Sequence, residues 1–295
     1  MALIGLVVKP GIPKALDLAA ELILWSEEKN HGLLLESNTA KIVGRRVKSK
    51  QLSSCPPEQL ALSADPIVTL GGDGTLIGIA RYVEGRSPVM IGVNFGHLGF
   101  LTEISPDELF VVLESVLSNG VRYADRSMLS ACVLREGKQV YSSQVVNDAV
   151  VQKGVKEKLL ELDLEVNGED VTRIRADGVI VSTPTGSTAY SLSAGGSIVH
   201  PTLEVSLVTP ICAHSLTNRP LILGMDAEIC VTIPQYEGQV FLIIDGQVSF
   251  ELKVGDRLSV TRAQNRVRFV RSPAKSYFEI LRTKLNWGVA NKAEL

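Results

Sequence analysis

The chain has 295 residues, of which 45% are apolar and 21% charged, a composition typical of one large globular domain or of two. Its formal net charge of −2 provides no basic field, so nucleic acid is not an expected partner. The four cysteines form no CxxC pair and no apolar run reaches the length of a membrane helix, which argues against zinc or redox motifs and against a membrane protein. With no signal peptide pattern at the start, we expect a cytoplasmic protein.

The first 125 residues alternate between strand and helix patterns. Apolar runs predict buried strands at 2–8, 32–40 (a strand and turn), 66–70 and 88–94. Helical spacing follows at 14–29, from the glycine-rich loop to Tyr82, and from the capping box at Ser105 to about Leu117. Residues 44–64 are polar and interrupted by prolines, which predicts a flexible loop. This alternation predicts an α/β domain with a mainly parallel sheet.

After Arg126 the pattern changes to short segments in which apolar and polar residues alternate. Turns such as Asn167–Gly168 separate them, and only a short helix near 187–194 interrupts them. This pattern predicts an all-β, sandwich-like domain. The predicted organisation is therefore an α/β domain, a β-rich domain, and a tail with a helical stretch and an apolar stripe, with bounds 1–125, 126–270 and 271–295.

The most informative loop is GGDGT, which follows the predicted strand at 66–70. Its glycines let a ligand approach the backbone amides, and amides at the start of a helix form an anion site. The spacing fits neither the P-loop nor the GxGxxG dinucleotide motif. Asp73 could accept a proton from an attacking hydroxyl or help to place a metal; alternatively, it caps the following helix in a tight turn.

Three further stretches are candidates for binding. NFGHLGFL (94–101) would lie beside GGDGT if the strands at 66–70 and 88–94 are neighbours, although a lone loop histidine such as His97 is more often simply solvated. STPTGSTAYSLSAGG (182–196) presents many hydroxyls, which suit ribose and phosphate oxygens. Asn147–Asp148 interrupts a predicted strand, and buried polar groups there often mark a site. For Asp245–Gly246–Gln247, a hairpin turn and a binding role remain equally open.

Taken in order, GGDGT, NFGHLGFL, ND, RADG, STPTGSTAYSLSAGG, TPICAHSLTNRPLIL and DGQ resemble the NAD kinase family over nearly the whole chain. GGDGT alone also occurs in lipid and sugar kinases, whereas the serine- and threonine-rich stretch is far more specific. The resemblance implies transfer of the γ-phosphoryl group of ATP to the 2′-hydroxyl of the adenosine ribose of NAD. It also implies a divalent cation, commonly Mg²⁺, a homo-oligomer (dimer or tetramer), and a tail that returns to the N-terminal domain.

By the same resemblance, Asp73 matches the catalytic base and Gly74 contacts NAD beside it. Asn147 matches a residue at the adenine end, and Asp148 stands where most members have glutamate. The other positions that match NAD-contacting residues are Lys158, Arg175, Asp177, Thr188, Ala189, Tyr190, Ser191, Leu192, Ser193 and Gln247. No metal ligand is assigned.

Other classes of function remain open at this point. A lipid or sugar kinase could share GGDGT but would not need the long hydroxyl-rich loop. A non-catalytic NAD sensor would need the binding loops but not Asp73. An NAD(P) dehydrogenase is disfavoured because GxGxxG is absent.

Overall fold

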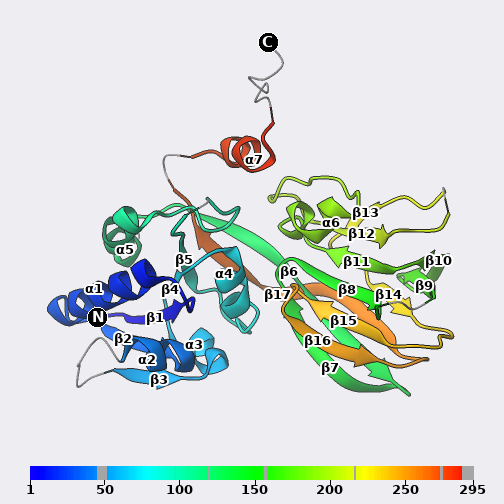
Figure 1. The fold of residues 1–295 in the computed structure, drawn as a ribbon, viewed down its shortest axis with the longest axis horizontal. Coiled ribbons are helices and arrows are strands. Elements are labelled where there is room, and N and C mark those ends of the chain that lie inside the picture. The colour runs from blue at the N-terminus through cyan, green and yellow to red at the C-terminus, as the bar shows by residue number, and fades with distance from the viewer. Residues whose placement is uncertain are drawn as a thin grey trace, which may run out of the picture. The chain divides into compact units, whose positions relative to one another are not determined.

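The computed structural model describes residues 1–44, 52–96, 98–118, 120–155, 158–215, 217–272 and 275–287 (Figure 1). The chain divides into two compact units, of which unit 1 comprises Met1–Asp125 and Val267–Leu295 and unit 2 comprises Arg126–Arg266. Each unit has its own apolar core.

Unit 1 is built on a sheet with the strand order β17-β5-β4-β1-β2-β3. Every pairing along this order is parallel, so helices connect the strands, as parallel neighbours require. The strands are β1 (Leu3–Val8), β2 (Gly32–Glu36), β3 (Ser53–Cys55), β4 (Ile67–Leu70), β5 (Val89–Val93) and β17 (Arg257–Val270), of which β17 belongs to unit 1 only from Val267. The predicted α/β domain with a mainly parallel sheet is confirmed.

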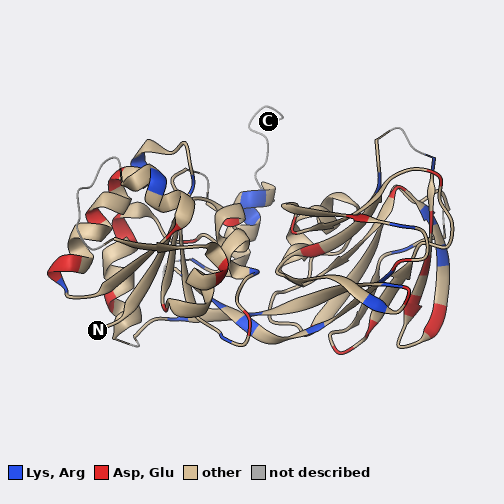
Figure 2. Ribbon diagram, turned by 90° about the horizontal axis from the view of Figure 1, so that it is seen from below, with Lys and Arg blue, Asp and Glu red and all other residues tan. Residues whose placement is uncertain are grey.

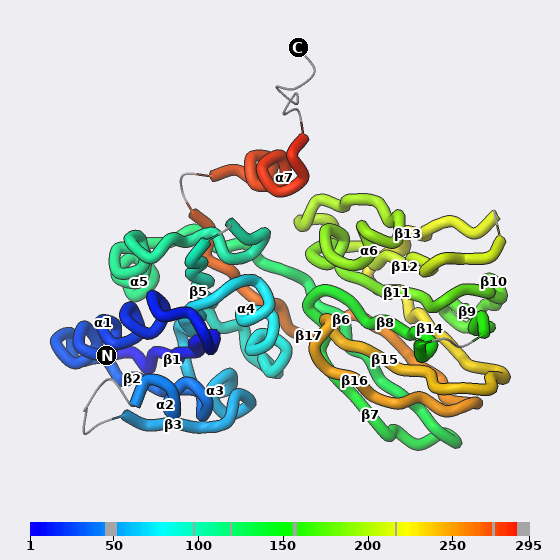
Figure 3. The backbone as a smooth tube through the Cα atoms, viewed as in Figure 1, coloured from blue at the N-terminus to red at the C-terminus, as the bar shows by residue number. Residues whose placement is uncertain are grey.

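Helices pack on both faces of this sheet. The helices of unit 1 are α1 (Pro13–Glu28), α2 (Ser37–Val43), α3 (Pro57–Ser63), α4 (Asp73–Ala80), η1 (Pro106–Glu108) and α5 (Leu109–Leu117), followed near the C-terminus by α7 (Tyr277–Leu285). Ile4 and Leu6 of β1 share one apolar cluster with α1 and α5. The residue between them, Gly5, faces the other way, and a Cβ there would meet Leu60 of α3. Successive strand residues alternate between faces, so α1 and α3 lie on opposite faces (Figure 3).

Unit 2 contains two antiparallel layers. One has the order β13-β12-β11-β8-β15-β16, and the other contains β10-β9-β14-β17 with the β6–β7 hairpin. The strands are β6 (Tyr123–Arg135), β7 (Lys138–Val145), β8 (Asp148–Lys153), β9 (Leu160–Val166), β10 (Glu169–Ala176), β11 (Gly178–Ser182), β12 (Val205–Ile211), β13 (Leu221–Gly224), β14 (Ile229–Thr232), β15 (Val240–Ile244) and β16 (Val248–Leu252). Two short helices, η2 (Gly186–Thr188) and α6 (Tyr190–Ser193), lie in the predicted helical stretch.

One apolar cluster fills the space between the two layers of unit 2. It includes Val151 and Val179 from one layer and Leu162 and Leu258 from the other, so the inward faces of both sheets meet in one core. The turn Asn167–Gly168 has φ of 53° and 79°, as a tight hairpin turn of this kind requires. The predicted β-rich, sandwich-like architecture is confirmed.

Three local predictions were wrong. Residues after Glu36 form helix α2 instead of a turn, because the Glu36 carboxylate accepts hydrogen bonds from the backbone N–H groups of Asn38 (2.8 Å) and Thr39 (2.9 Å) and caps the helix. The predicted loop at 44–64 contains β3 and α3 where it is described, with a proline at the first turn of α3; residues 45–51 lie outside the described part. Finally, Asn147 and Asp148 do not interrupt one strand, because β7 ends before them and β8 begins at Asp148.

Charged residues of both signs are interspersed along both units (Figure 2), consistent with the small net charge. In the described part of the chain, no helix has both the length and the apolar character needed to cross a membrane.

Candidate active site

Asp73 lies at the start of α4, where it receives hydrogen bonds from the loop after β5. Its Oδ2 accepts from the backbone N–H of Phe100 (2.8 Å). Its Oδ1 accepts from the backbone N–H groups of Leu101 (3.2 Å) and Thr102 (2.9 Å) and from the Thr102 hydroxyl (2.8 Å). The side chain is half-buried, so the carboxylate is held in a defined position while part of it stays accessible.

The capping alternative for Asp73 is wrong. The N-cap of α4 is Gly72, which makes no side-chain cap hydrogen bond, and Asp73 is the first helical residue. A carboxylate in the first turn is favoured by the helix dipole, but its hydrogen bonds run to the neighbouring loop. The residue therefore connects two glycine-containing loops at the carboxyl edge of the sheet.

The neighbouring arrangement of these loops follows from the strand pairing. β4 and β5 pair in parallel, with Leu70 opposite Val93, and Gly71 donates its N–H to the Val93 carbonyl (2.9 Å). The conditional prediction that the loop after β5 lies beside GGDGT is thus confirmed, except for His97, which lies outside the described residues. Ligands of open α/β sheets bind at this edge.

Two glycines allow this close approach. A Cβ on Gly99 would overlap Oδ1 of Asp73 and Oγ1 of Thr102. A Cβ on Gly71 would lie 2.5 Å from the Thr75 hydroxyl and 2.9 Å from Cβ of Lys9. At both positions a residue other than glycine would force these neighbouring side chains or the loop to shift.

Unit 2 contains a cavity of about 380 Å³ beside the start of β8. Asn147, Asp148, Ala189 and Tyr190, which the family resemblance singled out, line it, and so do Asp245 and Gly246 of the turn for which a binding role was left open. The cavity size suits part of a nucleotide. The turn between β7 and β8 and the start of α6 thus meet at one concave site.

Asn147 and Asp148 are both unusual in their surroundings. Among the described residues, the buried Oδ1 of Asn147 has no hydrogen-bond partner, which is rare for a buried polar atom. The Asp148 side chain is only 4% exposed. Its burial and then the charge of Asp245 raise the pKa of Asp148 to about 7. Such perturbed groups in a concave site are typical of binding or catalytic positions.

Most hydroxyls of the serine- and threonine-rich stretch stabilise the loop itself. Thr183 donates to the Val146 carbonyl (2.7 Å), and Ser187 donates to that of Pro184 (2.7 Å). The fully buried Ser191 bonds Thr209 (2.9 Å). The loop is therefore ordered. Of the stretch 188–193, only Ala189 and Tyr190 line the described cavity, so NAD contacts by Thr188, Ser191, Leu192 and Ser193 stay predictions.

The other residues that the resemblance singled out do not line the described cavity. Three of them form ion pairs, which are Lys158–Glu237 (3.9 Å), Arg175–Glu161 (3.1 Å) and Asp177–Lys153 (3.3 Å). Gln247 is exposed in the turn between β15 and β16, and Gly74 is exposed near the start of α4. Their roles stay predictions.

Thr102 is the residue whose importance the sequence did not reveal, whereas for Asp245 it left a hairpin turn and a binding role equally open. Asp245 sits at φ 51° before Gly246, so the hairpin-turn reading is correct. Its carboxylate also reaches the cavity. The signal for it was an aspartate before glycine at the end of an apolar strand, which any hairpin could share. Nothing in the sequence distinguished Thr102 from other loop threonines.

The implied divalent cation can be compared with the side chains present. Within the described residues, no group of three or more His, Cys, Asp or Glu side chains could hold a metal ion. Mg²⁺ is usually bound by one or two carboxylates together with substrate phosphates. Asp73, the one carboxylate in GGDGT, fits such a site only in combination with phosphate oxygens.

Comparison with known sequences gives matches over most of the chain. Residues 4–121 match the family described as the ATP-NAD kinase N-terminal domain, and residues 146–272 match the ATP-NAD kinase C-terminal domain. A protein of Geobacter sulfurreducens named NAD kinase is 46% identical over 98% of this chain and 99% of its own. One of Magnetococcus marinus, also named NAD kinase, is 40% identical over 99% of this chain and 96% of its own.

The chain is also similar to solved structures of NADH and NAD kinases. The chain is similar to yeast NADH kinase complexed with NADH, with a TM-score of 0.90, 29% identity, and coverage of 98% of this chain and 89% of the other. It is also similar to an NAD kinase from Archaeoglobus fulgidus in complex with ATP, with a TM-score of 0.73, 24% identity, and coverage of 95% and 99%; at that identity the similarity shows the fold alone.

Proposed function

Because the chain belongs to the NAD kinase family, we propose that it transfers the γ-phosphoryl group of ATP to the 2′-hydroxyl of the adenosine ribose of NAD. The products are NADP and ADP. The observation that carries the proposal is the Asp73 carboxylate, fixed at the ligand-binding edge of a parallel sheet by four hydrogen bonds. The family description, which names ATP, supports the donor.

Asp73 acts as the general base in this proposal. A ribose hydroxyl is a poor nucleophile while it keeps its proton, and a carboxylate at hydrogen-bonding distance can accept that proton as the new P–O bond forms. Oδ2 accepts one hydrogen bond, whereas Oδ1 accepts three. Oδ2 is therefore the oxygen with more capacity to accept the proton.

The remaining binding groups are divided between the loops. Backbone amides of the GGDGT loop would hold the donor phosphates, since glycines leave them open to a ligand. The cavity at Asn147 and Asp148 would hold the adenosine part of NAD. The unpaired Oδ1 of Asn147 could accept a hydrogen bond from the exocyclic amine of the adenine. The yeast relative's complex with NADH supports a dinucleotide ligand.

A divalent cation completes the proposal by neutralising phosphate charge when it is bound. The residues of this chain then supply positioning, which accounts for most of the catalysis of phosphoryl transfer. A homo-oligomer, which rests on the family resemblance, also belongs to the proposal, as does a location in the cytoplasm, which rests on the sequence pattern.

The test is to replace Asp73 and to measure NADP formation from NAD, ATP and Mg²⁺ together with NAD binding. In Asp73→Asn and Asp73→Ala, turnover should fall by about 10²–10⁴-fold, the usual contribution of a general base, while NAD still binds. Near-normal turnover in both variants would remove Asp73 from the chemistry. NAD binding without NADP formation in the unaltered protein would instead identify a non-catalytic NAD sensor.

A control is needed because Asp73 also holds the loop after β5. An asparagine has a single acceptor oxygen and would face one N–H donor with its own amide, so thermal unfolding is measured alongside activity. Asp107→Asn, at an exposed position in η1, is the matched control and should leave turnover unchanged.

A further inference from the structure

Asp245 holds the turn between β7 and β8 by direct hydrogen bonds. Its Oδ1 accepts from the backbone N–H groups of Val146 (3.1 Å), Asn147 (2.7 Å) and Asp148 (3.2 Å). In return, the Asp245 N–H donates to the Asp148 carbonyl (2.8 Å). The side chain is 9% exposed. The Asp245 carboxylate, which follows the end of β15, thus fixes the backbone of Asn147 and Asp148 at the start of β8.

The two carboxyl groups of this cavity differ in what surrounds them. Three N–H donors stabilise the ionised form of the Asp245 carboxylate. In the described part of the chain, no residue donates a hydrogen bond to the carboxyl of Asp148, which is buried beside this charge. Burial first, and the Asp245 charge second, raise the pKa of Asp148 to about 7. Asp148 is therefore the carboxyl group of the cavity that keeps its proton as pH rises to about 7.

Building on the proposed function, we infer that Asp245 is a positioning residue of the nucleotide cavity, which fixes Asn147 and Asp148 in place and keeps Asp148 as a hydrogen-bond donor. A neutral carboxylic acid donates an O–H to a ring nitrogen or a ribose oxygen, whereas an ionised one can only accept. The Asp245 carboxylate that lines the cavity also repels phosphate. The cavity therefore takes the base or ribose of the nucleotide.

The charged and titratable groups around Asp148 determine whether NAD affinity rises or falls with pH. The titratable groups that line the cavity with it are Asp245 and Tyr190, and neither is a cation at neutral pH. The nearest lysine on its own strand, Lys153, is paired with Asp177 (3.3 Å). On β11, the residue opposite Asp148 is the uncharged Ser182. As pH rises through about 7, Asp148 loses its proton and the cavity loses a donor, so NAD affinity should fall.

The experiment measures NAD affinity by calorimetry from about pH 5.5 to about pH 8.5, on both sides of the Asp148 pKa of about 7. Asp245→Asn keeps an acceptor oxygen for the N–H groups but removes the charge, so the midpoint of the pH profile should move down by about 1 pH unit or more. The KM for NAD near neutral pH should rise more than kcat falls. Asp148→Asn, which is always neutral, should flatten the profile. Asp170→Asn, at an exposed position of β10, should reproduce the unaltered protein.

An unmoved midpoint in Asp245→Asn would overturn the inference, and so would NAD affinity that does not change with pH in the unaltered protein. If Asp245→Asn fails to fold, carbon-13 NMR of the Asp148 carboxyl in the unliganded native protein decides. Titration near the ordinary value of 3.8 would overturn the inference, and titration near 7 would support it. Absence of NADP formation with titration near 7 would refute the proposed function alone.

Discussion

Asp73 combines two demands that usually exclude each other. A general base needs a lone pair directed at its substrate, whereas a residue that holds a loop directs its lone pairs at donors. Here Oδ1 accepts three hydrogen bonds and Oδ2 accepts one. Oδ1 therefore holds the loop, while Oδ2 keeps a lone pair that can accept a proton from the substrate.

Gly99 tests this arrangement without changing a reactive group. In Gly99→Ala, the new methyl would overlap Asp73 and Thr102, so either the loop or the carboxylate must shift. Overpacking of this kind destabilises by about 1–3 kcal/mol, and turnover should fall at least about tenfold because positioning dominates this chemistry. Chemical denaturation and NADP formation measure the two effects.

Gly96→Ala is the matched control in the same loop. A Cβ at Gly96 meets no atom within 4 Å, so stability and turnover should stay close to those of the unaltered protein. Equal behaviour of the two alanine variants would contradict a tight contact between Gly99 and Asp73.

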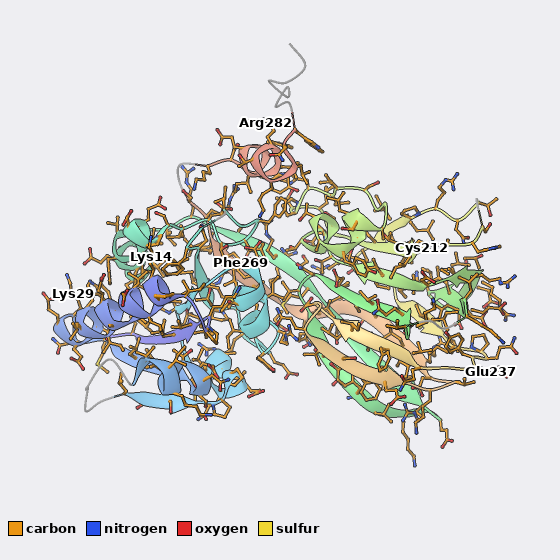
Figure 4. All side chains as sticks on the ribbon, in the orientation of Figure 1. Lys14, Lys29, Cys212, Glu237, Phe269 and Arg282 are labelled. Atoms are coloured by element: carbon orange, nitrogen blue, oxygen red, sulfur yellow. The ribbon has the colours of Figure 1, made fainter. Side chains whose placement is uncertain are left out.

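At the scale of elements, α7 contacts the loop that holds Asp73. Its N-terminus has a capping box, in which the Glu279 N–H donates to the Ser276 hydroxyl (3.3 Å) and the Ser276 N–H donates to the Glu279 carboxylate (2.6 Å). Lys284 lies 5.7 Å from the centre of the Phe100 ring. Figure 4 shows this helix at its labelled residue Arg282.

Removing the cap should loosen α7. Ser276→Ala should destabilise the helix by about 0.5–2 kcal/mol, so amide hydrogen exchange within α7 should become faster while β1 and β4 keep their protection. Ser249→Ala, at an exposed position of β16, is the control. Unchanged exchange in α7 would show that its buried Ile280 and Leu281 hold it without the cap.

The elements also show what the sequence can predict and why. Strands β1, β2, β4 and β5 and helix α1 follow from apolar periodicity, because each buries one face or both in a core. Helix α2 could not be found in this way, since it depends on Glu36 turning its side chain back onto the next amides. The same applies to the site: GGDGT marks Asp73, but its four donors come from residues 27–29 positions away, a relation that only the pairing of β4 with β5 creates.

At the scale of the whole molecule, unit 1 contributes the proposed base and unit 2 the nucleotide cavity. Each unit has its own apolar core. In unit 2, the buried carboxyl groups of Asp256 and Asp148 have pKa values shifted in opposite directions. Asp256 is held by two hydrogen bonds from Arg135 (2.8 and 2.7 Å), which with the backbone N–H of Lys253 outweigh burial and lower the pKa of Asp256. Asp148 has no such support, and its pKa is raised.

The raised pKa of Asp148 should make the free energy of unfolding depend on pH. Between its ordinary value of 3.8 and about 7, the folded protein keeps a proton that the unfolded chain releases, so stability falls as pH rises through this interval. Asp148→Asn should therefore stabilise the protein above pH 7 by roughly 2–4 kcal/mol. The difference should shrink towards acid pH. Denaturant unfolding across this range measures it.

Asp256→Asn should change the free energy of unfolding in the opposite direction to Asp148→Asn. Its carboxylate stabilises the fold at neutral pH, and that stabilisation is lost as pH falls through the lowered pKa of Asp256. This variant should be less stable at neutral pH. If Asp148→Asn instead lost stability above pH 7, the ionised Asp148 would not be the group that destabilises the fold.

The overlap between a side chain at position 99 and the Asp73 carboxylate has a consequence for how such chains can change over evolutionary time. A larger residue at 99 becomes tolerable only after both Thr102 and Asp73 have changed, and the proposed base is lost with the aspartate. A descendant that gave up catalysis but kept NAD binding could change these residues and fill position 99. Residue 99 would then record, in a lineage of sequences, whether phosphoryl transfer had been kept.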